Sequence, residues 1–321
     1  MFVLGLQGSP RKDGNTATLL TSFLAETERL GARTHNLPVA EKKITPCRGC
    51  RTCEREGFCP LKDDMEEIYP LLWRADLIVM ATPVFFYGPP AQMKALIDRS
   101  QALWSRRYVF NLTDPGRRWR QGFLLSLGAT KGEKLFDGLT LIAKYFFDAV
   151  GASLVGSLTY RQIEEPGDIA KHQTALTETK EKAVELIQPF LKRKKILFLC
   201  RENACRSQMA SAFARYYAGD RVEAESAGSQ PAQEINASMV EAMKEKGIDM
   251  AFLRTSSIDK ILSYMKPDMI VTMGCEDECP FIPGVPIQGW NLPDPSGKPI
   301  SLMREVRDEI EKRVKKLIGD S

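Results

Sequence analysis

An alternation of short apolar runs with longer amphipathic stretches constrains the fold of this chain more than any other feature. In the first part of the chain it predicts strands at residues 2–7, 76–81, 123–127 and, more weakly, 154–158. Helical patterns cover residues 16–30, 64–74, 92–104, 134–150 and 168–191. Buried strands separated by helices of this length form a parallel sheet with helices on both faces, so the pattern predicts an α/β fold.

The same alternation restarts after residue 191. New strands are predicted at residues 195–199, 222–225 and 268–273, with helices at 207–217, 237–246 and 302–318. A chain of 321 residues has room for two domains. We therefore expect two doubly wound parallel-sheet domains, spanning residues 1–191 and 194–321.

Composition argues against nucleic-acid and membrane partners. The net charge is only +4, without the clustered excess of a nucleic-acid-binding domain. The most apolar stretch, residues 71–87, is interrupted by Arg74 and Asp76 and is therefore not a membrane span. No charged segment followed by an apolar stretch begins the sequence, so we expect a cytoplasmic protein.

The eight cysteines fall into three groups. The groups are Cys47, Cys50, Cys53 and Cys59; Cys200 and Cys205; and Cys275 and Cys279. A cytoplasmic chain of this size needs no disulfide scaffold, so clustered cysteines point to metal or redox chemistry.

The first predicted strand runs into a loop rich in small polar residues, GSPRKDGNT at residues 8–16. Backbone N–H groups and hydroxyls at a strand-to-helix turn suit an anion such as a phosphate. The loop lacks the Gly-Lys-Ser/Thr ending of an NTP-binding loop and a GxGxxG fingerprint. An ordinary helix-capping turn is the alternative.

Two further loops at the same sheet edge provide the walls of a pocket. ATPVFFYG at residues 81–88 has three consecutive aromatic residues that a core does not explain, and SLGAT at 126–130 follows the next strand. Open α/β sheets bind ligands at this edge, and a flat cofactor needs polar backbone along its rim and apolar groups over its face. The expected cofactor-binding residues are Ser9, Arg11, Asn15, Thr16, Pro83, Val84, Phe85, Phe86, Tyr87, Gly88, Ser126 and Gly128.

These motifs resemble the NADPH-dependent FMN reductase family, which has a flavodoxin-like fold. GSPRKDGNT resembles its phosphate loop, and ATPVFFYGPPAQMKALIDR resembles its flavin-ring loop and the helix that follows. The resemblance implies bound FMN, NAD(P)H as reductant, and a homodimer or larger assembly formed through the flavin domain.

The spacing Cys47-x2-Cys50-x2-Cys53-x5-Cys59 resembles the iron–sulfur flavoproteins within that family. Four thiolates in one compact loop suit a [4Fe–4S] cluster. A four-cysteine zinc site and free thiols without metal are the alternatives.

The restarted strand leads directly into Cys200-Arg201-Glu202-Asn203-Ala204-Cys205-Arg206-Ser207. A loop of this kind wraps backbone N–H groups around a tetrahedral oxyanion, with Arg206 and the helix dipole supplying positive charge. The same field favours a thiolate nucleophile at Cys200. Ser207 is expected to donate to that thiolate and Asn203 to hold the loop; a buried, inert cysteine is the alternative.

A leaving oxygen needs a proton, and neither of the two histidines lies in a motif. The candidate acid is Asp294 in WNLPDP, where we expect Trp290 and the flanking prolines to desolvate the carboxyl group.

This half resembles the low-molecular-weight tyrosine phosphatases and, within that fold, the arsenate reductases. The segments are LFLCRENACRSQMA, ESAGSQPAQEIN, IVTMGCEDECPFIPG and WNLPDPSGKP. The arsenate reductase resemblance implies a relay in which Cys200 attacks arsenate, Cys275 attacks Cys200, and Cys279 resolves that disulfide. The sequence departs from the family at two points. Arg201-Glu202 stands where many relatives have small residues, and Ser211 stands where family members often have Glu.

Together the halves predict a bifunctional oxidoreductase that reduces arsenate to arsenite, with the flavin module or thioredoxin re-reducing the cysteine pair. Two other functions remain open: a protein tyrosine phosphatase fused to a redox regulator, and a non-catalytic redox sensor.

Overall fold

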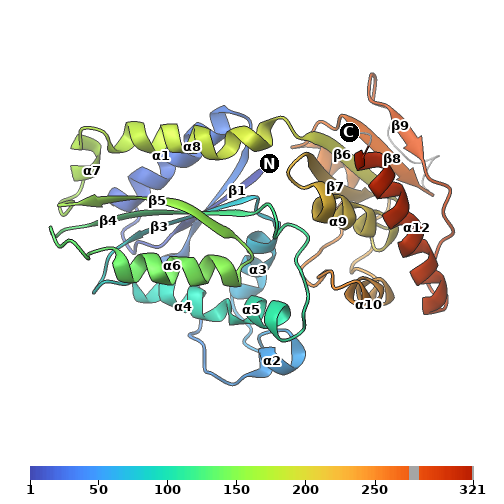
Figure 1. Cartoon of the computed structure of the whole chain (residues 1–321), viewed down its shortest axis with the longest axis horizontal. Helices are drawn as coiled ribbons and strands as arrows, with labels where there is room; N and C mark the ends of the chain where they lie inside the picture. Colours follow the sequence, from blue (N-terminus) through green and yellow to red (C-terminus); the bar gives the residue numbers. More distant parts are fainter. Residues whose placement is uncertain (275–281, 320–321) are drawn as a thin grey trace. The chain divides into compact units, whose positions relative to one another are not determined.

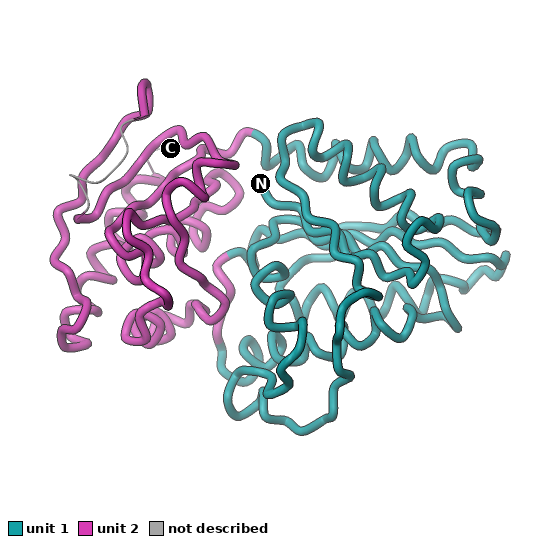
Figure 2. The backbone as a smooth tube through the Cα atoms, turned by 180° about the vertical axis from the view of Figure 1, so that it is seen from behind, with its two compact units in different colours: residues 1–111, 116–191 teal, residues 112–115, 192–321 magenta. Residues whose placement is uncertain are grey.

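The computed structural model describes residues 1–274 and 282–319. The chain forms two compact units (Figure 2): unit 1 comprises Met1–Asn111 and Gly116–Leu191, and unit 2 comprises Leu112–Pro115 and Lys192–Ser321. Among the described residues, no helix is long and apolar enough to cross a membrane.

Unit 1 is built on a five-stranded, wholly parallel sheet of order β2-β1-β3-β4-β5 (Figure 1). Its strands are β1 (Phe2–Gln7), β2 (Arg33–Pro38), β3 (Leu77–Pro83), β4 (Gln121–Gly128) and β5 (Ser153–Arg161). Every residue of β1 is buried because this strand has neighbours on both sides and helices on both faces. This strand order is that of the flavodoxin-like fold.

Helices cover both faces of the unit 1 sheet. One face carries α1 (Asn15–Arg29), α7 (Asp168–Lys171) and α8 (Ala175–Leu191); the other carries α3 (Met65–Arg74), α4 (Ala91–Arg99), α5 (Gln101–Tyr108) and α6 (Asp137–Ala149). On the first face Phe23 stacks on Phe123, with ring centroids 6.0 Å apart, in a core shared with α8.

Three features of unit 1 depart from the sequence pattern. Strand β2 was not predicted, because it is an edge strand whose only buried residue is Leu37. The helix expected over residues 92–104 is two helices that meet at Ser100, whose hydroxyl donates to Leu96 O at 3.1 Å. The helix expected over 168–191 is broken at His172, where α7 ends.

Unit 2 has a four-stranded parallel sheet of order β7-β6-β8-β9. Its strands are β6 (Lys194–Cys200), β7 (Val222–Gly228), β8 (Met269–Met273) and β9 (Ile287–Gly289). One face packs against α9 (Arg206–Ala218), α10 (Ala237–Glu245) and α12 (Ile300–Gly319), and the other against α11 (Ile258–Leu262). The sequence thus folds into two parallel-sheet α/β domains, as the alternation predicts.

A short segment from the middle of the first half belongs to unit 2. Thr113 donates its backbone N–H to Gly247 O at 2.7 Å, and Asp249 donates to Thr113 O at 2.9 Å. The side chains of residues 112–115 show no pattern that predicts this pairing, because it is made by backbone groups.

Candidate functional sites

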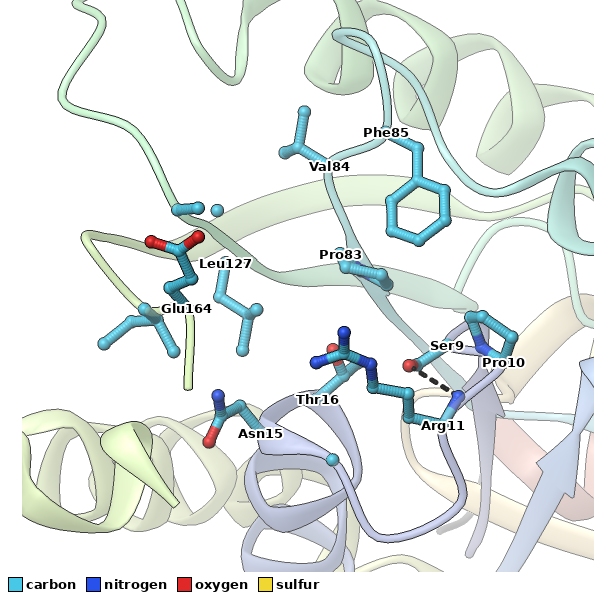
Figure 3. A pocket seen from close by; sticks show the side chains of 14 residues that line it. Ser9, Pro10, Arg11, Asn15, Thr16, Pro83, Val84, Phe85, Leu127 and Glu164 are labelled. Atoms are coloured by element: carbon cyan, nitrogen blue, oxygen red, sulfur yellow. Dashed lines mark hydrogen bonds between the residues drawn. The ribbon is translucent and has the colours of Figure 1, made fainter. Parts of the chain in front are cut away.

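A cavity of about 250 Å³ opens at the carboxyl ends of the unit 1 strands, where open α/β sheets bind ligands (Figure 3). It is lined by Ser9, Pro10, Arg11, Gly14, Asn15, Thr16, Pro83, Val84, Phe85, Leu127, Gly128, Ala129, Ile163 and Glu164. The loop after β1 and the loops after β3 and β4 therefore converge on one space, as expected.

The polar side of this cavity is the start of helix α1. The helix begins at Asn15 after Gly14, an N-cap residue that has no side chain to cap the helix. The first amides of a helix lack intrahelical acceptors and carry partial positive charge, so an anion is stabilised there. Ser9 Oγ accepts from Arg11 N at 3.2 Å and fixes the loop before the helix. This corner of the cavity fits a phosphate group.

Asn15 lines the cavity but uses its side chain to brace it. The amide Nδ2 donates to Glu165 O at 2.8 Å, and Oδ1 accepts from Gly167 N at 3.0 Å and Ile169 N at 3.3 Å. These bonds join the start of α1 to the loop after β5. They also place Ile163 and Glu164 in the lining. The sequence motifs did not predict these two residues. Their position after the fifth strand of a parallel sheet is the signal that could have identified them.

The aromatic loop makes a tight turn beside the cavity. Phe85 and Gly88 exchange two backbone hydrogen bonds of 2.8 and 3.0 Å, and the intervening Phe86 and Tyr87 have φ of 48° and 63°. Positive φ at both central residues defines a type I′ turn, which normally selects Asn-Gly. Phe85 lines the cavity, whereas Phe86 is fully exposed; Phe86, Tyr87 and Gly88 are outside the lining.

Two expected residues of the loop after β4 have different roles. Ser126 is buried and donates its hydroxyl to Thr82 O at 2.8 Å, so it joins β4 to β3 and does not line the cavity. Gly128 does line it, and a Cβ there would lie 2.8 Å from Leu135 Cδ2.

The four cysteines of unit 1 share a second cavity, of about 490 Å³. Cys47 and Cys50 precede α2 (Thr52–Glu56), Cys53 lies in it, and Cys59 follows it. Burial and the proximity of Cys59 and Cys47 raise the pKa of the half-buried Cys53 thiol. A hydrogen bond from Thr52 Oγ1 lowers the pKa of Cys50.

No three His, Cys, Asp or Glu side chains in the described part of the chain are already arranged around a metal position. The donor set nevertheless fits a thiolate-ligated metal site, because four thiols line a single cavity and thiolates are the ligands of both iron–sulfur and zinc sites.

In unit 2, Cys200 ends strand β6 and lies in a closed loop that leads into α9. Its side chain is 3% exposed, and its Sγ lies 3.0 Å from Ser207 Oγ. Asn203 Nδ2 donates to the same hydroxyl at 2.9 Å. Ser207 thereby receives one hydrogen bond and is positioned to donate the other to the sulfur.

Asn203 also fixes the backbone of the loop. It adopts φ of 52°, and its Oδ1 accepts from Ser256 N at 2.8 Å and from Gln208 Nε2 at 3.1 Å. Gly228 packs behind it, where a Cβ would lie only 2.6 Å from Arg201 O. The loop is therefore held from β7, from α9 and from the segment before α11.

Arg206 connects this loop to the candidate acid. Its Nη1 donates to Leu292 O at 3.3 Å, and its Nη2 lies 3.3 Å from Asp294 Oδ2. Trp290 is buried against Phe198, but the Asp294 side chain is 62% exposed. The expected desolvation of Asp294 is therefore wrong, because the tryptophan packs into the core while the carboxyl group faces solvent beside the arginine.

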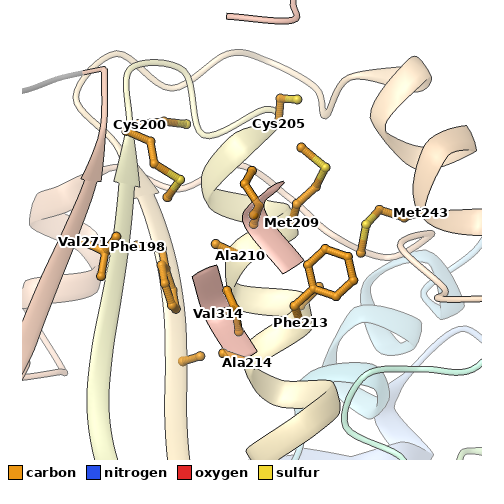
Figure 4. Packing of buried hydrophobic residues seen from close by; sticks show 14 of the residues in the cluster. Phe198, Cys200, Cys205, Met209, Ala210, Phe213, Ala214, Met243, Val271 and Val314 are labelled. Carbon is orange, nitrogen blue, oxygen red and sulfur yellow. The ribbon is translucent and has the colours of Figure 1, made fainter. Parts of the chain in front are cut away.

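Cys205 is buried in the same packing as α9 and α12 (Figure 4). Burial and the nearby Cys200 raise the pKa of the Cys205 thiol, which lies 3.3 Å from the Met303 sulfur. A thiol held protonated in this way is a poor nucleophile.

Cys275 and Cys279 lie outside the described residues. The chain leading to them is anchored, however: Met273 is the strand partner of Cys200, and a Cβ on Gly274 would lie 2.9 Å from Arg206 Nη1. The residue that precedes Cys275 therefore adjoins the loop that contains Cys200 and Arg206.

Fold and sites define an α/β protein with a flavodoxin-like cofactor pocket in one unit and a phosphatase-type cysteine loop in the other. Residues 1–133 match the family model of the NADPH-dependent FMN reductases, and residues 195–320 match that of the low-molecular-weight phosphotyrosine protein phosphatases. The chain is thus a fusion of two domain types.

Individual relatives divide in the same way. Over 131 residues (41% of this chain), it is 43% identical to an iron–sulfur flavoprotein of Methanocaldococcus jannaschii, of which it spans 64%. Over 123 residues (37% of this chain), it is 40% identical to arsenate reductase 2 of Staphylococcus haemolyticus, of which it spans 92%. A crystal structure of an arsenate reductase from Archaeoglobus fulgidus is 34% identical with a TM-score of 0.35, covering 39% of this chain and 98% of that one. Through its second unit, the chain belongs to the arsenate reductase family.

Proposed function

We propose that this protein reduces arsenate to arsenite at Cys200 and regenerates its thiols with electrons from NAD(P)H through FMN bound in unit 1. The observation that carries the proposal is the geometry of Cys200. Its sulfur lies 3.0 Å from Ser207 Oγ in a loop braced by Asn203, and its strand partner Met273 leads toward Cys275.

The reaction balances with three thiols. The Cys200 thiolate attacks arsenic(V), and an oxygen leaves as water with a proton from Asp294. The Cys275 thiolate then attacks Cys200 sulfur; the S–As bond breaks, and its electron pair stays on arsenic, which leaves as arsenite. Cys279 attacks Cys275 and expels the Cys200 thiolate, so one Cys275–Cys279 disulfide forms for each arsenate reduced.

Arg206 has two functions in this scheme. Its guanidinium contributes positive charge to the oxyanion loop, and its contact with Asp294 Oδ2 at 3.3 Å holds the acid at the mouth of the loop. The Asp294 carboxyl group is also open to solvent.

In unit 1, the start of α1 with Ser9, Arg11 and Thr16 would hold the FMN phosphate, and Pro83, Val84 and Phe85 would contact the ring. FMN held by these residues would supply electrons from NAD(P)H in pairs, the number needed to reduce one disulfide. Cys47, Cys50, Cys53 and Cys59 would ligate a [4Fe–4S] cluster, which transfers electrons singly. We place the enzyme in the cytoplasm, where NAD(P)H and reduced thiols are maintained.

A homodimer formed through unit 1 is part of the proposal. The aromatic turn packs against α6, because a Cβ on Gly138 would lie 2.7 Å from Tyr87 O. Helix α6 also exposes Leu141 and Tyr145, which are 56% and 65% exposed and lie one helical turn apart. Exposed apolar groups of this kind, on a helix against which the aromatic turn packs, are typical of a surface that another subunit covers.

The experiment separates arsenate reduction from phosphatase activity, which the same loop and acid would also support. Full-length protein is supplied with dithiothreitol and assayed for arsenite, and in parallel for hydrolysis of p-nitrophenyl phosphate. We expect Cys275→Ser and Cys279→Ser to lose catalytic arsenate turnover but keep slow ester hydrolysis. Ester hydrolysis without arsenite formation by the unmodified protein would establish the phosphatase instead. If the unmodified protein shows neither activity, the redox-sensor function is favoured.

A further inference from the structure

The four-cysteine loop is closed by one buried side chain, Arg99 at the end of α4. Arg99 is 1% exposed and donates from Nη1 to Thr45 O at 2.8 Å and from Nη2 to Leu61 O at 3.3 Å. Thr45 precedes the first cysteine of the loop and Leu61 follows the last. One guanidinium therefore ties together the two ends of the segment that carries all four thiols.

Asp63 completes this closure. Its carboxylate accepts from Arg99 Nη1 at 2.6 Å and Nη2 at 3.2 Å, and from the backbone N–H groups of Thr45 at 2.9 Å and Met65 at 3.1 Å. Burial acts to raise the pKa of Asp63, but these hydrogen bonds outweigh it and hold the pKa below its ordinary value. The pair is therefore ionised, and Arg99 carries a permanent positive charge at the cavity wall.

The third side-chain nitrogen of Arg99, Nε, has no acceptor in the described part of the chain. Nε is buried and makes no hydrogen bond, although Arg99 lines the cysteine cavity. A buried N–H without a partner is costly, and native structures rarely leave one unless a ligand or ordered water satisfies it. Arg99 is also the only buried charged residue in this lining, whose residues are all described.

We infer that Arg99 is the positioning residue of the four-cysteine site and that its Nε–H donates to a sulfur atom of the group held there. The inference rests on the proposed occupancy of this loop by an iron–sulfur cluster. Hydrogen bonds and positive charge at cluster sulfurs stabilise the reduced form, so Arg99 raises the reduction potential of the site.

The test compares Arg99→Lys with Arg120→Lys in the full chain. Arg120 is equally buried, but its donors meet the backbone carbonyls of Trp73, Ala75 and Val150, so it reports the general cost of replacing a buried arginine in unit 1. Each protein is reconstituted anaerobically with iron and sulfide. Iron and zinc are determined per bound FMN, and the midpoint potential is measured by an EPR-monitored titration.

We expect Arg99→Lys to lose at least half of the iron per FMN and to show a lower midpoint potential in the fraction that retains it. Arg120→Lys should match the unmodified protein in both quantities. An unchanged potential at unchanged iron content in Arg99→Lys would overturn the inference alone. An unmodified protein that takes up zinc, or no iron, would overturn the proposed cluster as well.

A measurement on the unmodified protein covers the case in which Arg99→Lys fails to fold. With arginine labelled by ¹⁵N, pulsed EPR of the reduced cluster should show a ¹⁵N coupling from the Nε–H donor. The coupling should persist when the exposed Arg48 and Arg51 in the same lining are both replaced by Lys. Absence of the coupling, or its loss in that double variant, contradicts the assignment to Arg99.

Discussion

The two cysteine loops of this protein are held to different degrees. The loop around Cys200 is fixed along its length: Arg201 O, Glu202 O and Ala204 O each accept a backbone hydrogen bond of 2.8–2.9 Å. The loop that carries the four clustered cysteines is held mainly at its ends, where Arg99 and Asp63 meet, and at one interior point, where Arg106 Nη1 donates to Gly57 O at 3.2 Å.

The difference suits the two roles that we propose for these loops. A nucleophile that stabilises an oxyanion needs its donors in place before the substrate arrives, because reorganisation during the reaction raises the barrier. Thiolates that ligate a cluster can complete their geometry when the group binds, since binding and local ordering are coupled. Cys200 is accordingly buried, whereas Cys47 and Cys50 are exposed.

The largest effect is expected at the nucleophile. Cys200→Ser should reduce arsenate turnover by at least ~10³-fold, because a serine hydroxyl is barely ionised at neutral pH. Cys47→Ser should leave dithiothreitol-driven arsenate reduction unchanged, since this thiol lines the four-cysteine cavity of unit 1. Arsenite formation is the readout. Equal losses in the two variants would mean that the cysteine groups do not have separate roles.

A smaller effect is expected from disturbing the backbone of the catalytic loop. A Cβ at Gly228 would lie 2.6 Å from Arg201 O and 2.8 Å from Asn203 N, so Gly228→Ala must displace the oxyanion donors. A displacement of about 1 Å corresponds to a loss of roughly 10²-fold in kcat. Gly319→Ala, which meets no atom within 4 Å, is the control. If both variants keep full kcat, the loop is not preorganised in the way described.

The next prediction concerns the aromatic turn. Replacing Phe86-Tyr87 by Asn-Gly keeps the type I′ geometry but removes both exposed rings. We expect the protein to shift from dimer to monomer at ~10 µM in sedimentation velocity. The variant has less exposed apolar surface to bury between two subunits. FMN affinity should change much less, since Phe85 remains in the cavity. A dimer that persists in this variant would place the interface elsewhere.

The smallest effect is an acid-dependent loss of stability in unit 2. Although burial opposes ionisation, hydrogen bonds from Lys315, Tyr217 and Lys246 lower the pKa of Glu311 to about 2. A depressed pKa stabilises the fold above the ordinary Glu value of 4.5, and this stabilisation disappears as the pH falls toward 2.

Glu311→Gln should therefore destabilise unit 2 at pH 7 by about 1–2 kcal/mol, allowing for solvent screening. Hydrogen exchange in α12 measures this in the full chain. The difference between the two proteins should shrink below pH 4.5; a difference that stays constant from pH 7 to pH 3 would show that the charge of Glu311 is not responsible.

The sequence predicted the buried framework and part of each site, for identifiable reasons. Central strands such as β1 and β6 are continuous apolar runs, so their positions were plain, whereas β2 is polar and left no signal. The pairing of Thr113 with unit 2 uses only backbone groups, which no side-chain pattern reports.

Within the sites, motif position identified which loops converge, but not what each side chain does. Ser9 and Phe85 line the unit 1 cavity as expected, while Ser126 turns out to hold two strands together. Arg99 was not recognised at all, because a single arginine in an amphipathic helix has no signature; its importance comes from contacts with residues 36 to 54 positions away.

The central claim is that the flavin unit and the cysteine relay complete one catalytic cycle. The direct test is the ratio of NAD(P)H consumed to arsenite formed by the full-length protein with bound FMN, under anaerobic conditions and without thioredoxin. The account predicts a ratio of one, because each arsenate leaves one disulfide and each NAD(P)H supplies two electrons, and it predicts that Cys200→Ser abolishes both. NAD(P)H oxidation by added FMN without any arsenite, in a protein that still reduces arsenate with dithiothreitol, would show two independent enzymes in one chain.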